Sequence, residues 1–266
     1  MKGMGKSRRP FPAPKTAIMP GAMTSGGGQN SGVIERAAYD AAYPRVTDAL
    51  TLYGWRAPAF ELVRAASTAG VTPTTVTLVE ALLSALAFAL LWNARYWPGL
   101  AVALIVTLLS IAALMQERTS AGHPIWAKRF RLAVELVPPA FWWWAWAHGL
   151  PTAGHALAPV YATMVLWVVV GGYIADLAID GLSHQRFGGM SIHAWQPVDS
   201  YFRLVAAGRN SNLILLVTAM LFGRPDAGLE LVAWWTLITL IFHSVRFAQL
   251  TERQARREKI VSWLDR

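Results

Sequence analysis

The sequence predicts an all-α membrane protein, in which six transmembrane helices follow an amphipathic helix at the membrane interface. Hydrophobic residues make up 55% of the 266 positions and charged residues only 15%, whereas soluble domains carry about 25% charged residues. The apolar residues gather in long blocks, each near the ~20 residues that a helix needs to cross the hydrocarbon core. We expect helices because open strands cannot satisfy their backbone hydrogen bonds in lipid.

The six predicted spans cover residues 75–92, 98–115, 131–149, 158–179, 204–222 and 227–248. The third contains Pro138 and Pro139, which should kink it. The aromatic run at 141–146 lies near the far end of this span. We interpret the run as a belt at the membrane interface, where indole rings are favoured, in preference to a ligand-stacking site.

The flanking segments complete the predicted organisation. Residues 1–32 are rich in Gly, Pro, Ser and basic side chains, and we expect a disordered basic cytoplasmic tail. Residues 33–74 form a juxtamembrane amphipathic segment, residues 75–250 the six-helix transmembrane domain, and residues 251–266 a basic cytoplasmic tail. Within "PAFELVRAAS", Ala59, Leu62 and Val63 share one helical face, whereas Glu61 and Arg64 lie on the other.

The distribution of charge predicts a multi-pass protein of a bacterial-type inner membrane, with both termini in the cytoplasm. The chain has 24 Lys and Arg against 15 Asp and Glu. Basic residues concentrate in the connections 116–130 and 180–203 and in the C-terminal tail, whereas the opposite loops hold Arg95 and Arg224. Because topology explains this excess, we expect no nucleic-acid partner. The sequence has no cysteine, which excludes disulfides and thiolate chemistry.

In four features the chain resembles the CDP-alcohol phosphatidyltransferase family. These are the six spans with cytoplasmic termini, the preceding amphipathic helix, "VTPTTVT" at the first span, and the length of the loop after the second. The family signature is D-x-x-D-G-x-x-A-R, eight residues, then G-x-x-x-D-x-x-x-D. Its four aspartates hold two divalent cations that grip the diphosphate of a CDP-linked donor, and the last acts as general base. The resemblance also implies a homodimer.

The signature is largely replaced in this chain. Without gaps, Ser110 and Ala113 occupy the first two aspartate positions, Arg131 the third and Glu135 the fourth, while Arg118 matches the arginine. One carboxylate cannot hold two magnesium ions, and the fixed charge of Arg131 would repel a cation. We therefore expect no metal at Ser110, Ala113 and Arg131, and no cofactor.

Other residues retain the chemistry of a phosphate site. By resemblance, the nucleotide would lie near Thr72, Pro73 and Thr74, which form a weakened version of a TPN-type motif. Arginine can clamp phosphate oxygens with two hydrogen bonds. The candidates for binding phosphate or lipid are Arg118, Arg131, Arg203 and Arg209.

The fourth span offers an alternative acidic site. Asp176 and Asp180 are four residues apart on one helical face, which His184 continues. They could bind Mg²⁺, or Asp180 could simply end the helix while Asp176 pairs with an arginine. The candidate catalytic residues are accordingly Glu135 and Asp180. The role of Glu80, inside the first span, stays open between a replacement acid and a buried protonated group.

These observations favour a protein linked to phospholipid metabolism whose standard two-metal reaction is inactive. It would bind an anionic lipid or a CDP-linked nucleotide, with membrane lipids as partners. Two alternatives remain. The first is an active lipid-linked phosphotransferase with a relocated site at Asp176 and Asp180. The second is a non-catalytic partner or transporter subunit.

Overall fold

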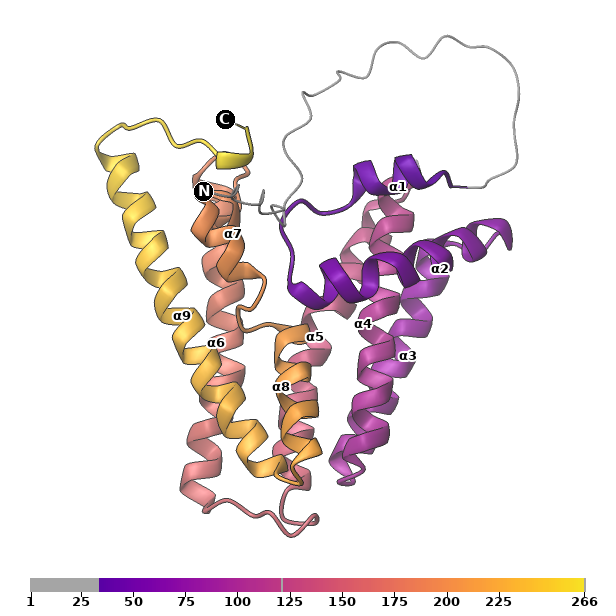
Figure 1. Cartoon of the computed structure of the whole chain (residues 1–266), viewed down its shortest axis with the longest axis vertical. Helices are drawn as coiled ribbons and strands as arrows, with labels where there is room; N and C mark the ends of the chain where they lie inside the picture. The colour runs from indigo at the N-terminus through magenta and orange to yellow at the C-terminus, as the bar shows by residue number, and fades with distance from the viewer. Residues whose placement is uncertain (1–33, 121, 266) are drawn as a thin grey trace, which may run out of the picture.

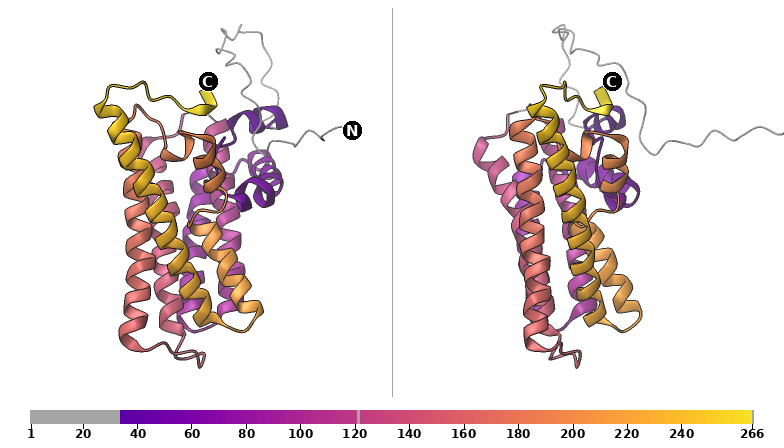
Figure 2. Two further views of the ribbon diagram at one scale, coloured as in Figure 1. Left: turned by 60° about the vertical axis from the view of Figure 1, so that its left-hand side comes forward. Right: turned by 90° about the vertical axis from the view of Figure 1, so that its left-hand side faces the viewer.

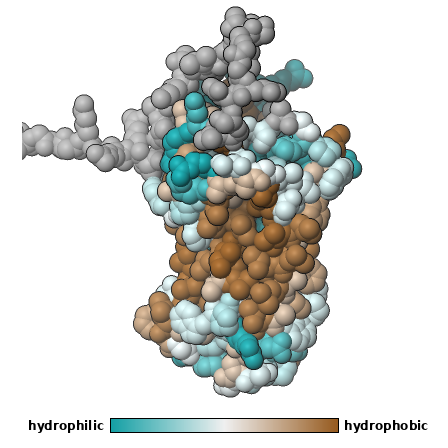
Figure 3. All heavy atoms as spheres, turned by 90° about the vertical axis from the view of Figure 1, so that its right-hand side faces the viewer, coloured by the Kyte–Doolittle hydropathy of each residue, from teal (hydrophilic) through white to brown (hydrophobic). Residues whose placement is uncertain are grey.

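The computed structural model describes residues 34–120 and 122–265, and within them it is helical with no strands. The predicted basic tail at 1–32 lies outside the described residues. Four of the described helices are long and apolar enough to cross a membrane: α3 (Pro73–Trp92), α4 (Tyr96–Thr119), α6 (Pro159–Arg186) and α9 (Pro225–Ala255). They form two packed pairs, α3 with α4 and α6 with α9, on opposite sides of the bundle (Figure 1). On the face seen in Figure 3, a broad apolar zone separates two more hydrophilic ends. The chain is therefore a membrane-embedded protein.

The third and fifth predicted spans correspond to α5 (Ile125–Gly149) and α8 (Arg209–Leu221), which differ from the other four. Helix α5 has 25 residues, but it carries Lys128, Arg129 and Arg131 near its start. Helix α8 has only 13 residues, or ~20 Å at 1.5 Å per residue, which is short of the ~30 Å hydrocarbon core. The predicted span at 204–222 is too long because residues 204–208 are apolar but precede the helix.

The N-terminal segment contains α1 (Arg36–Ala42), a π-helix (Leu50–Trp55) and α2 (Arg56–Thr68), all at one end of the bundle (Figures 1 and 2). Helix α2 buries Ala59, Phe60 and Val63 against α4. Of the predicted apolar face, Ala59 and Val63 are therefore confirmed, whereas Phe60 was not assigned to it. Leu62 remains 38% exposed.

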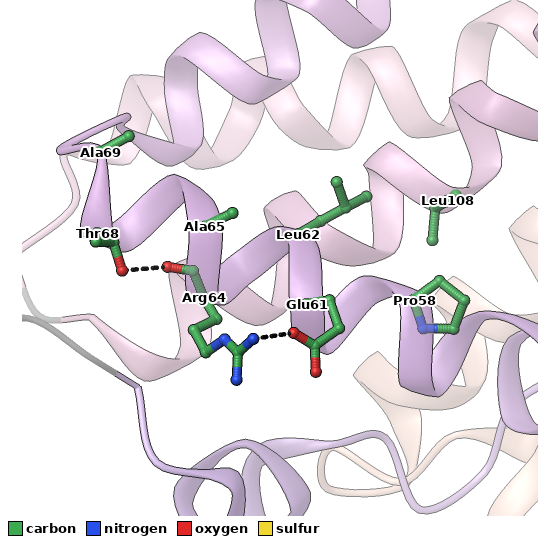
Figure 4. Close-up of a pocket in the computed structure, with 8 residues that line it drawn as sticks. All are labelled: Pro58, Glu61, Leu62, Arg64, Ala65, Thr68, Ala69 and Leu108. Carbon is green, nitrogen blue, oxygen red and sulfur yellow. Dashed lines mark hydrogen bonds and ion pairs between the residues drawn. The ribbon is translucent and has the colours of Figure 1, made fainter.

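A shallow groove follows the outer side of α2 and reaches Leu108 of α4 (Figure 4). Pro58 lies in the first turn of α2, where its missing N–H is tolerated. Along the groove, the Arg64 guanidinium contacts the Glu61 carboxylate at 2.6 Å. Because both groups are more than half exposed, this pair contributes little to stability.

The aromatic run of α5 is mostly core and not an interfacial belt, so that prediction is wrong for three of its tryptophans. Trp142, Trp143 and Trp146 are 0%, 1% and 0% exposed. The Trp142 indole donates to the Ser84 carbonyl at 3.1 Å, and the Trp146 indole to the Pro225 carbonyl at 3.0 Å. Packing of α5 against α3, α6 and α9 buries this face, and backbone carbonyls satisfy the two indole N–H groups.

The C-terminal segment folds back onto the same end as α1. Helix α9 continues to Ala255, and a short 3₁₀ helix, Trp263–Asp265, follows. The Trp263 indole donates to the Ser200 hydroxyl of α7 (Pro197–Arg203) at 2.9 Å. The Ser262 hydroxyl donates to the Ala194 carbonyl in the 3₁₀ helix η2 (Ile192–Ala194) at 2.7 Å. The last part of the predicted tail is thus packed against the bundle, whereas residues 252–259 are exposed.

Candidate functional site

A polar pocket of about 250 Å³ lies among α4, α5, α6 and the start of α8, beneath the N-terminal segment. Charged side chains from several parts of the sequence meet there. They come from the segment that precedes the π-helix, from α5 and α6, from the 3₁₀ helix η2, from the end of α7 and from the start of α8. The polar and charged side chains lining the pocket include Asp48, Glu135, Tyr173, Asp176, Asp180, His193, Arg203, Arg209 and Asn210.

The first turn of α8 forms one wall of the pocket, since residues 208–211 all line it. The first N–H groups of a helix have no acceptor inside that helix, and they carry the positive end of its dipole. Asn210 fixes this turn because its amide donates to both Asp48 carboxylate oxygens at 3.0 Å and to the Thr51 hydroxyl at 2.9 Å. The Ala207 N–H donates to the Thr239 hydroxyl of α9 at 2.9 Å.

Two guanidinium groups reach the same pocket. Within the described residues, the Arg203 side chain forms no hydrogen bond or ion pair. The Arg209 side chain is 11% exposed, and its Nη1 atom lies 3.7 Å from Oε1 of the fully buried Glu80. Together with the α8 terminus, these two cations make an arrangement suited to an anion, and to phosphate in particular.

The acidic side chains of α6 each contact a histidine or a hydroxyl. Asp176 contacts Nδ1 of His243 on α9 at 2.5 Å. Asp180 accepts a hydrogen bond from Ser191 at 2.7 Å, and its carboxylate lies 3.9 Å from Nε2 of His193. Burial lowers the pKa of His193 well below its usual value, and electrostatic interaction with the nearby Arg203 and His243 acts in the same direction. His193 is therefore neutral near pH 7.

The signature positions do not form a two-metal site. Arg131 bonds Glu117 at 2.6 Å and Glu135 at 2.7 Å, so the Glu135 carboxylate is already paired. Ser110 and Ala113 are buried and do not line the pocket. From α4 the pocket receives the apolar side chains of Ile111 and Leu114 and no carboxylate.

The alternative metal set also fails to converge. Asp176 and Asp180 both line the pocket, but His184 is exposed and lies outside it. In residues 34–120 and 122–265, no group of three or more His, Asp or Glu side chains is arranged to hold a metal ion. The acids of α6 thus contact protein groups one by one instead of sharing a coordination centre.

The other candidate residues have structural contacts away from the pocket. Arg118 donates to the Ala42 carbonyl at 3.0 Å and so attaches α1 to α4. The Thr72 hydroxyl caps α3 by accepting from the Thr75 N–H at 3.2 Å, with Pro73 at the first helical position. Neither these residues nor Thr74 lines the pocket.

The structure brings together Glu135, Asp176, Asp180, Arg203 and Arg209, all of which the sequence singled out. Sequence reasoning missed three residues: Asp48 and Tyr173, which line the pocket, and His243, which contacts Asp176 from α9. His243 could have been found, because an ionisable side chain inside an apolar span warrants suspicion of function. Asp48 and Tyr173 have no such signal, since only tertiary contacts bring them to the site.

Comparison with known proteins adds no further assignment, since no model of a protein family matches the chain and no curated protein matches its sequence.

Proposed function

We propose that this chain is a membrane protein of the CDP-alcohol phosphatidyltransferase type whose pocket binds the phosphate of an anionic lipid without transferring it. The observation that supports this proposal most is the convergence of Arg203, Arg209 and the first turn of α8 on one pocket. The pocket's volume of about 250 Å³ is below the ~300–1,000 Å³ of sites for drug-sized ligands. A phosphate headgroup suits this space better than a CDP-linked nucleotide.

The lack of metal-binding acids at the signature positions supports binding over transfer. Two-metal phosphoryl transfer needs clustered carboxylates that hold both cations against the phosphate. In this chain α4 supplies no carboxylate to the pocket, and Arg131 forms ion pairs with both Glu117 and Glu135. The cationic side chains of the pocket then act on the ligand directly.

The proposal places the pocket on the cytoplasmic side of a bacterial-type inner membrane. The end of the bundle that holds it also carries the basic connections 116–130 and 180–203 and the C-terminal segment, as expected for a cytoplasmic end. In this arrangement α5 is the third of six passes, and the short helix α8 together with the apolar residues 204–208 that precede it is the fifth. The family resemblance adds a homodimer to the proposal.

A second candidate is a phosphotransferase with its site on α6. Two carboxylate–imidazole contacts favour it, Asp176 with His243 and Asp180 with His193, because such pairs can serve general-base chemistry. A divalent cation would require a further ligand beside Asp176 and Asp180, and His184 does not provide it from outside the pocket.

Binding of short-chain phosphatidic acid to the full chain in detergent tests the proposal. Replacing Arg203 or Arg209 with Gln should weaken binding by roughly ten- to a hundredfold, because a charge-assisted hydrogen bond contributes about 1.5–3 kcal/mol. Arg118→Gln is the matched control and should leave affinity unchanged, since Arg118 bonds Ala42 outside the pocket. Equal affinity in all four proteins would refute the proposal.

A further inference from the structure

An apolar groove of about 680 Å³ runs between α5 and α6 on the outside of the bundle. Residues 136–144 of α5 and residues 166–177 of α6 contribute its lining. Trp144 and Trp167 stand at its edges and are 47% and 71% exposed. The volume is in the range of ligand sites, and the open side lets a lipid chain enter laterally from the bilayer.

The groove adjoins the polar pocket. Leu136, Tyr173 and Leu177 line both spaces. At this junction the Tyr173 hydroxyl donates to the Leu136 carbonyl at 3.1 Å, which fixes α5 against α6. A polar pocket that holds two arginines and an apolar groove with a common wall together match the two parts of an amphiphile.

The length of the groove also matches an acyl chain. At 1.5 Å per residue, its walls extend ~12 Å along α5 and ~16 Å along α6. Half of the ~30 Å hydrocarbon core is ~15 Å. The groove is thus about as long as the acyl region of one leaflet.

We propose that this groove is an acyl-chain site that takes one chain of a phospholipid whose phosphate lies at Arg203 and Arg209. The inference rests on the proposed function, because the phosphate selects the lipid and the groove holds its chain. An ordinary boundary lipid would occupy the groove without regard to its headgroup, and this difference can be measured.

Bromine on an acyl chain quenches the fluorescence of an indole that it touches, so Trp144 and Trp167 can report on the groove. The chain has 13 tryptophans, and the groove signal is therefore the difference between the wild type and a Trp144→Phe, Trp167→Phe variant. Nanodiscs of phosphatidylcholine would contain increasing fractions of brominated phosphatidic acid or, in parallel, brominated phosphatidylcholine. We expect half-maximal quenching at a roughly tenfold lower fraction of the phosphatidic acid.

Variants that fill the groove separate this inference from the proposed function. Ala140→Phe on α5 and Val170→Phe on α6 both enter the lining. Each should raise the half-quenching fraction of phosphatidic acid roughly tenfold, the loss expected when about two buried CH₂ groups no longer fit. Both variants should keep their affinity for inorganic phosphate in detergent. Ala133→Phe, at an exposed position of α5 outside the groove, should change neither value.

Each of the following outcomes would overturn the acyl-chain site, either alone or together with the proposed function. Equal quenching by the two brominated lipids, or no effect of both filling variants, would overturn the acyl-chain site and leave phosphate binding intact. Quenching by phosphatidic acid that persists in Arg203→Gln and Arg209→Gln would also overturn it. If the wild type binds no inorganic phosphate and shows no headgroup preference, the proposed function and this inference both fail.

Discussion

The pocket's carboxylates each contact a neighbouring side chain, whereas the Arg203 guanidinium has no such partner within the described residues. Asp176 contacts His243, and Asp180 accepts from Ser191. The acids remain negative charges near any anion in the pocket, but they are not free to displace it from the guanidinium groups. Whether removal of one of these carboxylates strengthens or weakens ligand binding therefore distinguishes an anion site from a metal site.

Replacing Asp180 or Asp176 with Asn should strengthen the binding of phosphatidic acid. A unit charge ~10 Å away contributes ~1–2 kcal/mol at an effective dielectric constant of ~20. Removal of one repulsive charge should therefore raise the affinity roughly five- to thirtyfold, as measured by titration in detergent. In a relocated magnesium site the same variants would lose binding and activity. A loss of affinity in Asp180→Asn that added Mg²⁺ partly restores would support that second candidate.

His193 should make the folded state less stable in acid. Its pKa is lowered in the folded protein, and the unfolded value is about 6.5. Below that pH the unfolded chain takes up a proton that the folded chain does not, so stability falls as pH decreases. The slope can reach about 1.4 kcal/mol per pH unit for one group. Thermal unfolding between pH 8 and 5 should show this fall, and His193→Asn should flatten it.

His184 provides the control for this pH series, since it is exposed on α6. The other ionisable groups around His193 are Asp180, Arg203 and His243. His184→Asn should retain the full dependence on pH. An unchanged slope in His193→Asn would show that another group causes the fall.

At the scale of the elements, α8 depends on the N-terminal segment for its position. Asn210→Ala removes the hydrogen bonds to Asp48 and Thr51, so the Asp48 carboxylate loses the donor that the Asn210 amide supplies. We expect a loss of about 1–3 kcal/mol in unfolding free energy, together with weaker phosphate binding because the first turn of α8 loses its anchor. Asn93→Ala, which removes an exposed bond to Ala89 at the far end, should leave binding unchanged. Identical effects of the two variants would contradict the anchoring role.

Hydropathy located the long helices but could not show what covers them. Hydropathy predicts α3, α4, α6 and α9 because a long, uninterrupted apolar stretch forms a helix in lipid. It does not predict the burial of Trp142, Trp143 and Trp146, since composition does not distinguish a lipid-facing indole from one packed between helices. The late start of α8 was missed for the same reason, because apolar residues also occur in a buried connection.

The sequence predicts those residues of the site that belong to a visible pattern. Asp176 and Asp180 are four residues apart on one helical face, and Arg203 and Arg209 belong to a segment that is unusually polar for a connection between spans. Arg118 and Arg131 are candidates only because of their places in the ungapped alignment with the family signature. In the structure Arg118 bonds the Ala42 carbonyl, and Arg131 bonds Glu117 and Glu135. Such partners depend on packing between helices, which one sequence does not reveal.

For the whole molecule, the account predicts that the pocket end faces the cytoplasm. Residues 150–158 and 222–224 lie between helices at the opposite end of the bundle. Reporter fusions after Leu150 and after Arg224 should therefore be active on the outer side only. A fusion at the C-terminal end provides the control and should report from the cytoplasm. A cytoplasmic signal from either loop fusion would contradict the six-pass topology.

Binding of a lipid phosphate in the pocket is tested most directly by a density map of the protein extracted with its native membrane lipids. A bound antibody fragment would give the particle sufficient size. We expect a phosphate density within hydrogen-bonding distance of the Arg203 and Arg209 guanidinium groups, near the first turn of α8. We also expect this density to continue into a chain between α5 and α6. Two metal peaks ~4 Å apart beside a nucleotide, or a pocket with only water at both arginines, would contradict this expectation.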